Sequence, residues 1–169
     1  HGGAYNGNVN AATQQYSPYD TRLWTVMSYI NPWTSNAKYY NSYPVTGTSW
    51  GVSPDGYYYS PTTPMILDIT AAQQLYGKAT SGPFASGNVV YGFNTNITGP
   101  VKAYFDFTVN THPVITIWNG GTHNTLDLSG FTSASTVSLN AGTFSSVAGA
   151  TNNIGAGATC GACPGGYTG

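Results

Sequence analysis

The sequence carries very little charge. Its 169 residues include five acidic and four basic side chains, and every acidic one is an aspartate because the chain contains no glutamate. Ordinary globular domains carry about a quarter charged residues, so solubility here must come from Asn, Ser, Thr and Gly. With so few basic residues there is no electrostatic footprint for a nucleic acid, and nucleic acid binding is excluded. A surface that changes little when carboxylates protonate also suggests adaptation to acid; the alternative is lineage drift in a secreted protein.

Long apolar runs are missing as well. No stretch reaches the roughly eighteen apolar residues that cross a bilayer, so no membrane span is expected. No basic region followed by an apolar block opens the chain, so no signal peptide is visible, and a start without methionine indicates a processed or truncated product. Cysteine is limited to Cys160 and Cys163, whose C-x-x-C spacing has no second pair and no histidine nearby. A local disulfide or two unpaired thiols is therefore favoured over a metal or redox site.

What is present divides into two parts. Residues 1–60 are rich in Gly, Asn, Ser, Pro and Tyr and predict long irregular loops, which are usually functional when they occur inside a compact domain. One convincing helix follows at 64–76. Thr63 is its expected N-cap, Pro64 fits the first helical position, and Gly77 stands where a left-handed C-terminal cap belongs. Apolar residues recur at helical spacing between them and predict a stripe that packs against the preceding loops.

After Gly77 the pattern changes to short runs rich in β-branched and aromatic residues, separated by Gly, Asn, Pro and Ser. These runs predict strands at 88–93, 101–107, 114–118, 125–128 and 136–139. They indicate a β-sandwich or β-roll that begins near residue 80. The tail from about residue 148 is too poor in apolar bulk to form a core alone, and is interpreted as a linker or as the start of a glycine-rich solenoid.

Several sequence motifs then occur in one order. They are His1-Gly2-Gly3-Ala4-Tyr5-Asn6, Tyr19-Asp20-Thr21-Arg22, Val26-Met27-Ser28-Tyr29, Pro64-Met65-Ile66-Leu67-Asp68-Ile69 with Ala71, Gln73, Leu75, Tyr76 and Gly77, Val90-Tyr91-Gly92-Phe93-Asn94, Ile117-Trp118, and Asn124-Thr125-Leu126-Asp127-Leu128-Ser129-Gly130-Phe131. Together they resemble the serralysin family of secreted metzincin zinc proteases over nearly the whole chain. Any one motif alone would be weak, whereas four or five in sequence are specific.

The resemblance implies an α+β chain of two domains. Residues 1–79 would be the C-terminal subdomain of a metzincin protease, made of loops and one helix, and residues 80–169 a β-sandwich or β-roll domain. It implies part of a secreted, extracellular zinc metalloendopeptidase, expected to be monomeric, that hydrolyses peptide bonds in proteins and is incomplete and inactive as these 169 residues. The alternative is a non-catalytic secreted module, adhesive or structural, that retains a serralysin-like scaffold.

The resemblance also implies a zinc site. His1 matches the third zinc-binding histidine, Met27 the methionine of the turn beneath the metal, and Tyr29 a tyrosine that binds zinc as an extra ligand and also stabilises the oxyanion during catalysis. The alternatives are an exposed N-terminal histidine, a core methionine and an ordinary tyrosine. The first two histidines of the family's motif and its glutamate base do not occur in this sequence. His112 and His123 lie far along the chain and are expected to be structural or surface residues.

Calcium is the second metal that the resemblance implies, at the junction between the two predicted domains. The implied site consists of Ala85, Gly87, Asn119, Gly121 and Asn124. Two aspartates of the family correspond to Asn119 and Asn124, and an amide oxygen can still coordinate Ca²⁺. Losing two carboxylates removes two negative charges, however, so binding should be weaker. Calcium binding and the loss of calcium binding are both kept as interpretations of this site. The calcium-binding β-roll repeat of the family, G-G-x-G-x-D-x-U-x, has no clean copy in the chain.

Overall fold

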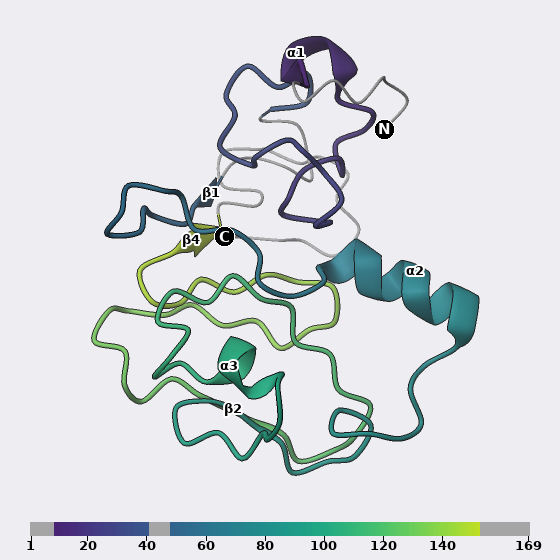
Figure 1. Ribbon diagram of the computed structural model, residues 1–169, viewed down its shortest axis with the longest axis vertical. Coiled ribbons are helices and arrows are strands. Elements are labelled where there is room, and N and C mark those ends of the chain that lie inside the picture. The colour runs from purple at the N-terminus through teal and green to yellow at the C-terminus, as the bar shows by residue number, and fades with distance from the viewer. Residues whose placement is uncertain (1–8, 41–47, 153–169) are drawn as a thin grey trace.

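The computed structural model describes residues 9–40 and 48–152. Within these ranges the helices are α1 (Ala11–Gln14), α2 (Ile66–Tyr76) and α3 (Lys102–Phe105), and the strands are β1 (Thr48–Ser49), β2 (Val90–Gly92), β3 (Thr125–Asp127) and β4 (Thr151–Asn152). Loops connect them and make up most of the molecule (Figure 1). The mixture of helix and strand confirms the α+β class in its coarse form. No helix in the described part of the chain has the length and apolar character needed to cross a membrane.

Two small sheets tie distant parts of the chain together. β1 pairs antiparallel with β4, so that Thr48 lies opposite Asn152, and the indole N–H of Trp50 donates to Asn152 Oδ1 at 2.9 Å. β2 pairs in parallel with β3, with Val90 opposite Thr125. Each sheet has two strands, so a β-sandwich or β-roll remains a prediction for this half of the chain.

The predicted strands at 88–93 and 125–128 are confirmed, as β2 and β3. The strand predicted at 101–107 is wrong, because this segment forms the single helical turn α3. Its backbone closes on itself, with Tyr104 N–H donating to Val101 O at 3.2 Å and Asp106 N–H to Lys102 O at 2.9 Å. Of the three aromatic residues in this segment, Phe105 and Phe107 are buried, whereas Tyr104 on the same helical turn is exposed.

The predicted strands at 114–118 and 136–139 are also absent from the described residues. The first segment bonds to the loop before α2, where Thr62 N–H donates to Val114 O at 3.0 Å and Thr116 N–H donates to Thr63 Oγ1 at 2.9 Å. The second segment keeps one isolated bridge, between Thr136 and Ser146. In both places extended residues bond to loops, so no ladder develops.

The helix predicted at 64–76 is confirmed as α2. Gly77 has a positive φ of 80° and donates its N–H to Gln73 O at 2.9 Å, but its ψ of 168° lies outside the left-handed helical region, so the predicted left-handed cap is wrong. The predicted N-cap is wrong: the N-cap position is Met65, whose N–H donates to the carboxylate of Asp68 at 2.8 Å. Thr63 lies two residues before this N-cap, and its hydroxyl accepts the Thr116 N–H.

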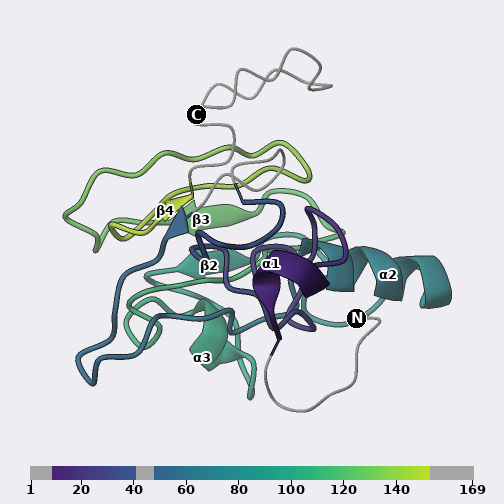
Figure 2. The same ribbon diagram turned by 90° about the horizontal axis from the view of Figure 1, so that it is seen from above.

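The predicted apolar stripe of α2 does not pack along its length. No residue of the helix is buried, and Leu75 and Tyr76 near its end are 76% and 88% exposed. Only the first turn, through Ile66 and Leu67, contacts the core. Both views accordingly show α2 projecting from one side of the molecule (Figures 1 and 2).

Two clusters of buried side chains form the core. The first contains Leu23, Trp24, Trp50, Met65 and Val114, and the second contains Val89, Tyr91, Ile97 and Phe105. The first cluster joins the N-terminal loops and the start of α2 to Val114, so its packing crosses residue 80. The division into domains at 1–79 and 80–169 stays a prediction.

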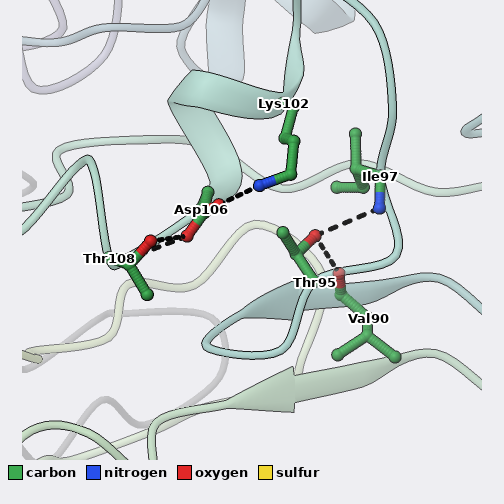
Figure 3. Close-up of polar contacts among 6 residues, drawn as sticks. All are labelled: Val90, Thr95, Ile97, Lys102, Asp106 and Thr108. Carbon is green, nitrogen blue, oxygen red and sulfur yellow. Dashed lines mark hydrogen bonds and ion pairs between the residues drawn. The ribbon is translucent and has the colours of Figure 1, made fainter.

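A buried carboxylate, Asp106, directly follows Phe105 of the second core. Lys102, on α3, forms an ion pair with Asp106, and the backbone N–H and hydroxyl of Thr108 donate to the same side chain at 3.0 and 2.6 Å (Figure 3). Nearby, Thr95 donates its hydroxyl to Val90 O at 2.6 Å and ties the following loop to β2. The bond from Lys102, followed by those from Thr108, lowers the pKa of Asp106 from 3.8 to about 2.

Asp106→Asn is expected to lower the melting temperature at neutral pH by about 3–6 °C, because the ionised acceptor of these bonds is lost. In the unchanged protein this contribution is fully present above 3.8 and disappears as the pH falls through about 2. Stability should therefore change little from neutral pH to about pH 4, and the gap between variant and parent should narrow toward pH 2. Thermal unfolding of both proteins across this pH range measures their melting temperatures. If the difference in melting temperature were the same at neutral pH and at pH 2, the role given to Asp106 would be contradicted.

Candidate functional site

The segment that contains Met27 is a turn with buried ends and an exposed tip. Leu23 and Trp24 before the tip are buried in the first core, and Ile30 after it is also buried. At the tip, the Met27 side chain is 69% exposed and Tyr29 is 50% exposed. The chain therefore presents a thioether and a phenol to the surface from a base held by the core.

Asp68, on α2, holds the first side of this turn. One of its carboxylate oxygens accepts the hydroxyl of Thr25 at 2.5 Å, and the other accepts the backbone N–H of Val26 at 2.9 Å. The second oxygen also accepts the N–H of Met65 at the helix N-cap. The turn and the helix start are further joined by Leu67 N–H, which donates to Trp24 O at 3.0 Å. A single carboxylate thus caps α2 and fixes the turn 42 residues away in sequence.

Asp20 holds the second side. Its Oδ1 accepts the hydroxyl of Ser28 at 2.8 Å, and that hydroxyl in turn accepts Ile30 N–H at 3.1 Å. Arg22 adds two bonds, from its backbone N–H to Ile30 O at 2.9 Å and from its side-chain Nε to Ser28 O at 3.3 Å. Ser28 is buried between the exposed Met27 and Tyr29. The tip is consequently held on both sides, and two of the five aspartates in the chain serve it.

His1, the predicted zinc ligand, lies outside the described residues. Within 9–40 and 48–152, no three or more His, Cys, Asp or Glu side chains gather in a way that could hold a metal ion. His112 stacks on Tyr59, with ring centroids 4.1 Å apart, and His123 is exposed. The described residues alone therefore do not provide a zinc site, and the roles of His1, Met27 and Tyr29 stay predictions.

The residues of the predicted calcium site do come together. The loop that contains Ala85 and Gly87 lies directly against the loop that contains Asn119, Gly121 and Asn124. Phe84 and Gly120 are joined by a backbone bond of 2.8 Å, and Asn88 and Thr122 by one of 3.0 Å. The two loops therefore lie together, and the calcium site itself stays a prediction.

A cavity of about 380 Å³ lies between the first core and the segment around residues 137–147. Its lining is largely apolar and includes Leu23, Trp50, Met65, Leu139 and Phe144, and Asn119 and Asn124 also reach it. Met27 and Tyr29 do not line it. The candidate zinc site and this cavity are separate places on the molecule.

Asp20 and Asp68 were not predicted as site residues, although both lie in motifs that carry the family resemblance. A signal was available in the composition. In a chain with five carboxylates, a surface carboxylate is not a routine solubility residue, and each of the five accepts at least one hydrogen bond. Two of the five, Asp20 and Asp68, fix the turn at residues 20–30.

Comparison with known proteins gives a consistent result. Residues 83–164 match the family described as the peptidase M10 serralysin C-terminal region. The chain is 34% identical to metalloprotease AprA of Pseudomonas entomophila over 157 residues, and 33% identical to serralysin of Proteus mirabilis over 156 residues. Serralysin C of Dickeya chrysanthemi is 31% identical over 157 residues. Each alignment covers 91% of this chain and 28–29% of the relative, so the chain spans less than a third of their length.

These matches cover nearly the whole chain, including the turn at 25–29, the helix α2 and the paired strands β2 and β3. The similarity therefore includes the residues between the short motifs as well as the motifs themselves. The chain is therefore similar to serralysin-type metalloproteases over 91% of its length, and its residues 83–164 match the serralysin C-terminal region.

Proposed function

We propose that this chain is part of a secreted zinc metalloendopeptidase, and that the turn at residues 20–30 forms the floor and one wall of its catalytic centre. The observation that carries the proposal is the double fixation of this turn by Asp20 and Asp68. Catalysis needs groups held in place before the substrate arrives, and a turn fixed on both sides supplies such positions. The names of two relatives, metalloprotease AprA and serralysin, support the reaction class.

In this proposal each residue has a distinct task. His1 would hold the metal through one ring nitrogen, and Met27 would pack against the metal-binding side chains. Bound Zn²⁺ supplies Lewis-acid polarisation of the scissile carbonyl. The phenol of Tyr29 donates a hydrogen bond to the negative charge that develops on the carbonyl oxygen. Two further histidines and a carboxylate base are needed, and this sequence does not contain that set, so the activity belongs to a longer protein.

The test measures zinc and proteolysis in the full-length protein. We expect bound zinc, loss of protein hydrolysis on chelation, and recovery on adding zinc back. His1→Ala should weaken zinc binding at least about tenfold, because one of a small set of ligands is lost. His123→Ala is the matched control, since this exposed histidine has no place in the proposed site and should leave the zinc content unchanged.

A protein that binds no zinc and whose function is insensitive to chelators would overturn the proposal. It would favour a non-catalytic secreted module instead, for which the complete lack of glutamate in this sequence is the supporting observation. Equal zinc loss in His1→Ala and His123→Ala would show that His1 has no special role at the metal.

A further inference from the structure

The two loops at the predicted calcium site are joined by side-chain amides as well as by the backbone. Asn124 spans the loops, because its Oδ1 accepts Val89 N–H at 3.1 Å while its Nδ2 donates to Gly121 O at 3.2 Å. Asn119 joins its own loop to β2, because its Oδ1 accepts Gly121 N–H at 2.6 Å and its Nδ2 donates to the hydroxyl of Tyr91 at 3.0 Å. Each amide thus uses both its acceptor and its donor.

The orientation of both amides follows from the backbone. A peptide N–H can only donate, so the group that faces Val89 N–H, and the one that faces Gly121 N–H, must be the amide oxygen. The Nδ2 groups are then directed at Tyr91 and at the carbonyl of Gly121. That carbonyl belongs to the implied calcium ligands, yet here an N–H group lies against it. A cation bound there would meet a donor hydrogen where it needs an oxygen.

The two backbones also approach too closely for an ion and its ligands to lie between them. A Cβ atom at Gly87 would lie 2.0 Å from the carbonyl oxygen of Thr122, and a Cβ at Gly121 would lie 2.1 Å from Gly87 N. Calcium takes six to eight oxygens at about 2.3–2.6 Å, mostly carboxylates and carbonyls. Glycine at both positions permits the direct contact of the loops, and the described residues do not fit a calcium ion here.

We infer that the amides of Asn119 and Asn124 close this junction in place of calcium, so that the pairing of β2 with β3 does not depend on the ion. An amide can make these contacts because it carries a donor as well as an acceptor. A carboxylate at either position could accept the backbone N–H but could not donate, and at Asn124 it would place negative charge against the carbonyl of Gly121. Asparagine in place of aspartate at these two positions weakens a calcium site, and its amide N–H supplies a direct hydrogen bond that a carboxylate could not make.

The first test needs no variant. Hydrogen exchange is followed in the full-length protein, in millimolar calcium and in excess chelator, at the amides of Asn88, Val89 and Gly120. We expect the same protection in both conditions, since these N–H groups bond to protein acceptors. Protection that falls when calcium is removed would overturn the inference. The local readout keeps the result separate from any calcium bound elsewhere in the protein.

The second test exchanges the amide for its carboxylate isostere. Asn124→Asp should lower the melting temperature by roughly 3–6 °C in chelator, because a donor is lost and a charge faces a carbonyl. It should also reduce protection at Val89, and millimolar calcium should restore part of both losses. Asn140→Asp, at an exposed asparagine outside the junction, adds the same charge and should change neither quantity by more than about 1 °C in melting temperature. An Asn124→Asp protein as stable as Asn140→Asp in chelator would contradict the role of the amide.

Discussion

Replacing Asp68 with alanine is expected to lower the free energy of unfolding by about 2–4 kcal/mol, because three donors lose an ionised acceptor at once. Those donors are the hydroxyl of Thr25 and the backbone N–H groups of Val26 and Met65. In the full-length protein the same change should reduce kcat/KM for peptide hydrolysis at least about tenfold, since Met27 and Tyr29 lose their fixed position. Urea unfolding and steady-state kinetics measure the two effects.

Two further variants define the cause. Asp68→Asn keeps the shape and one acceptor, so it should lose less stability than the alanine variant. Asp55→Ala removes a carboxylate that bonds to Ser53 within one exposed turn, and should change stability by no more than about 0.5 kcal/mol. If Asp68→Ala were as stable as Asp55→Ala, the coupling between the turn and α2 would be absent.

Tyr29→Phe is expected to reduce kcat of the full-length protein by about 10- to 100-fold with little change in KM. The reason is that the proposed hydrogen bond from the phenol forms to charge that exists only in the transition state. Steady-state kinetics on a peptide substrate separates the two constants, and the zinc content confirms that the metal is retained. Tyr57→Phe is the matched control, because it removes the hydroxyl of an exposed tyrosine outside the turn. A rise in KM at constant kcat would assign Tyr29 to substrate binding instead.

The sequence predicted the parts of the fold whose signals are local. α2 was found because its apolar spacing and Gly77 act within one segment, and Gly77 adopts the positive φ expected of it. The segment 101–107 was misassigned because a single helical turn is too short for its period to be distinguished from alternation. Phe105 and Phe107 are both buried, which looks like a strand when only the spacing is considered.

The sequence could propose candidate residues for the site, which stay predictions, but it could not show which residues hold them in place. Met27 and Tyr29 were found through neighbouring motifs, whereas the role of Asp68 depends on a contact between residues 25–26 and 68 that no local pattern encodes. The N-cap of α2 was missed for the same reason. The hydroxyl of Thr63 accepts the backbone N–H of Thr116 from a distant loop, and the N-cap is Met65. At the junction, the exchange of carboxylates for amides was visible in the sequence, but the donors that the amides serve became visible only once the two loops were placed together.

The pairing of β1 with β4 has a consequence for the order in which the protein folds. Trp50 is part of the first core, yet the partner of its indole N–H is Asn152, 102 residues further along the chain. Closing so long a loop costs more entropy than closing the 35 residues that separate Val89 from Asn124, and contacts of high sequence separation form slowly. The β2 and β3 half can therefore fold first. During synthesis, the N-terminal half cannot complete its core until residue 152 has been added.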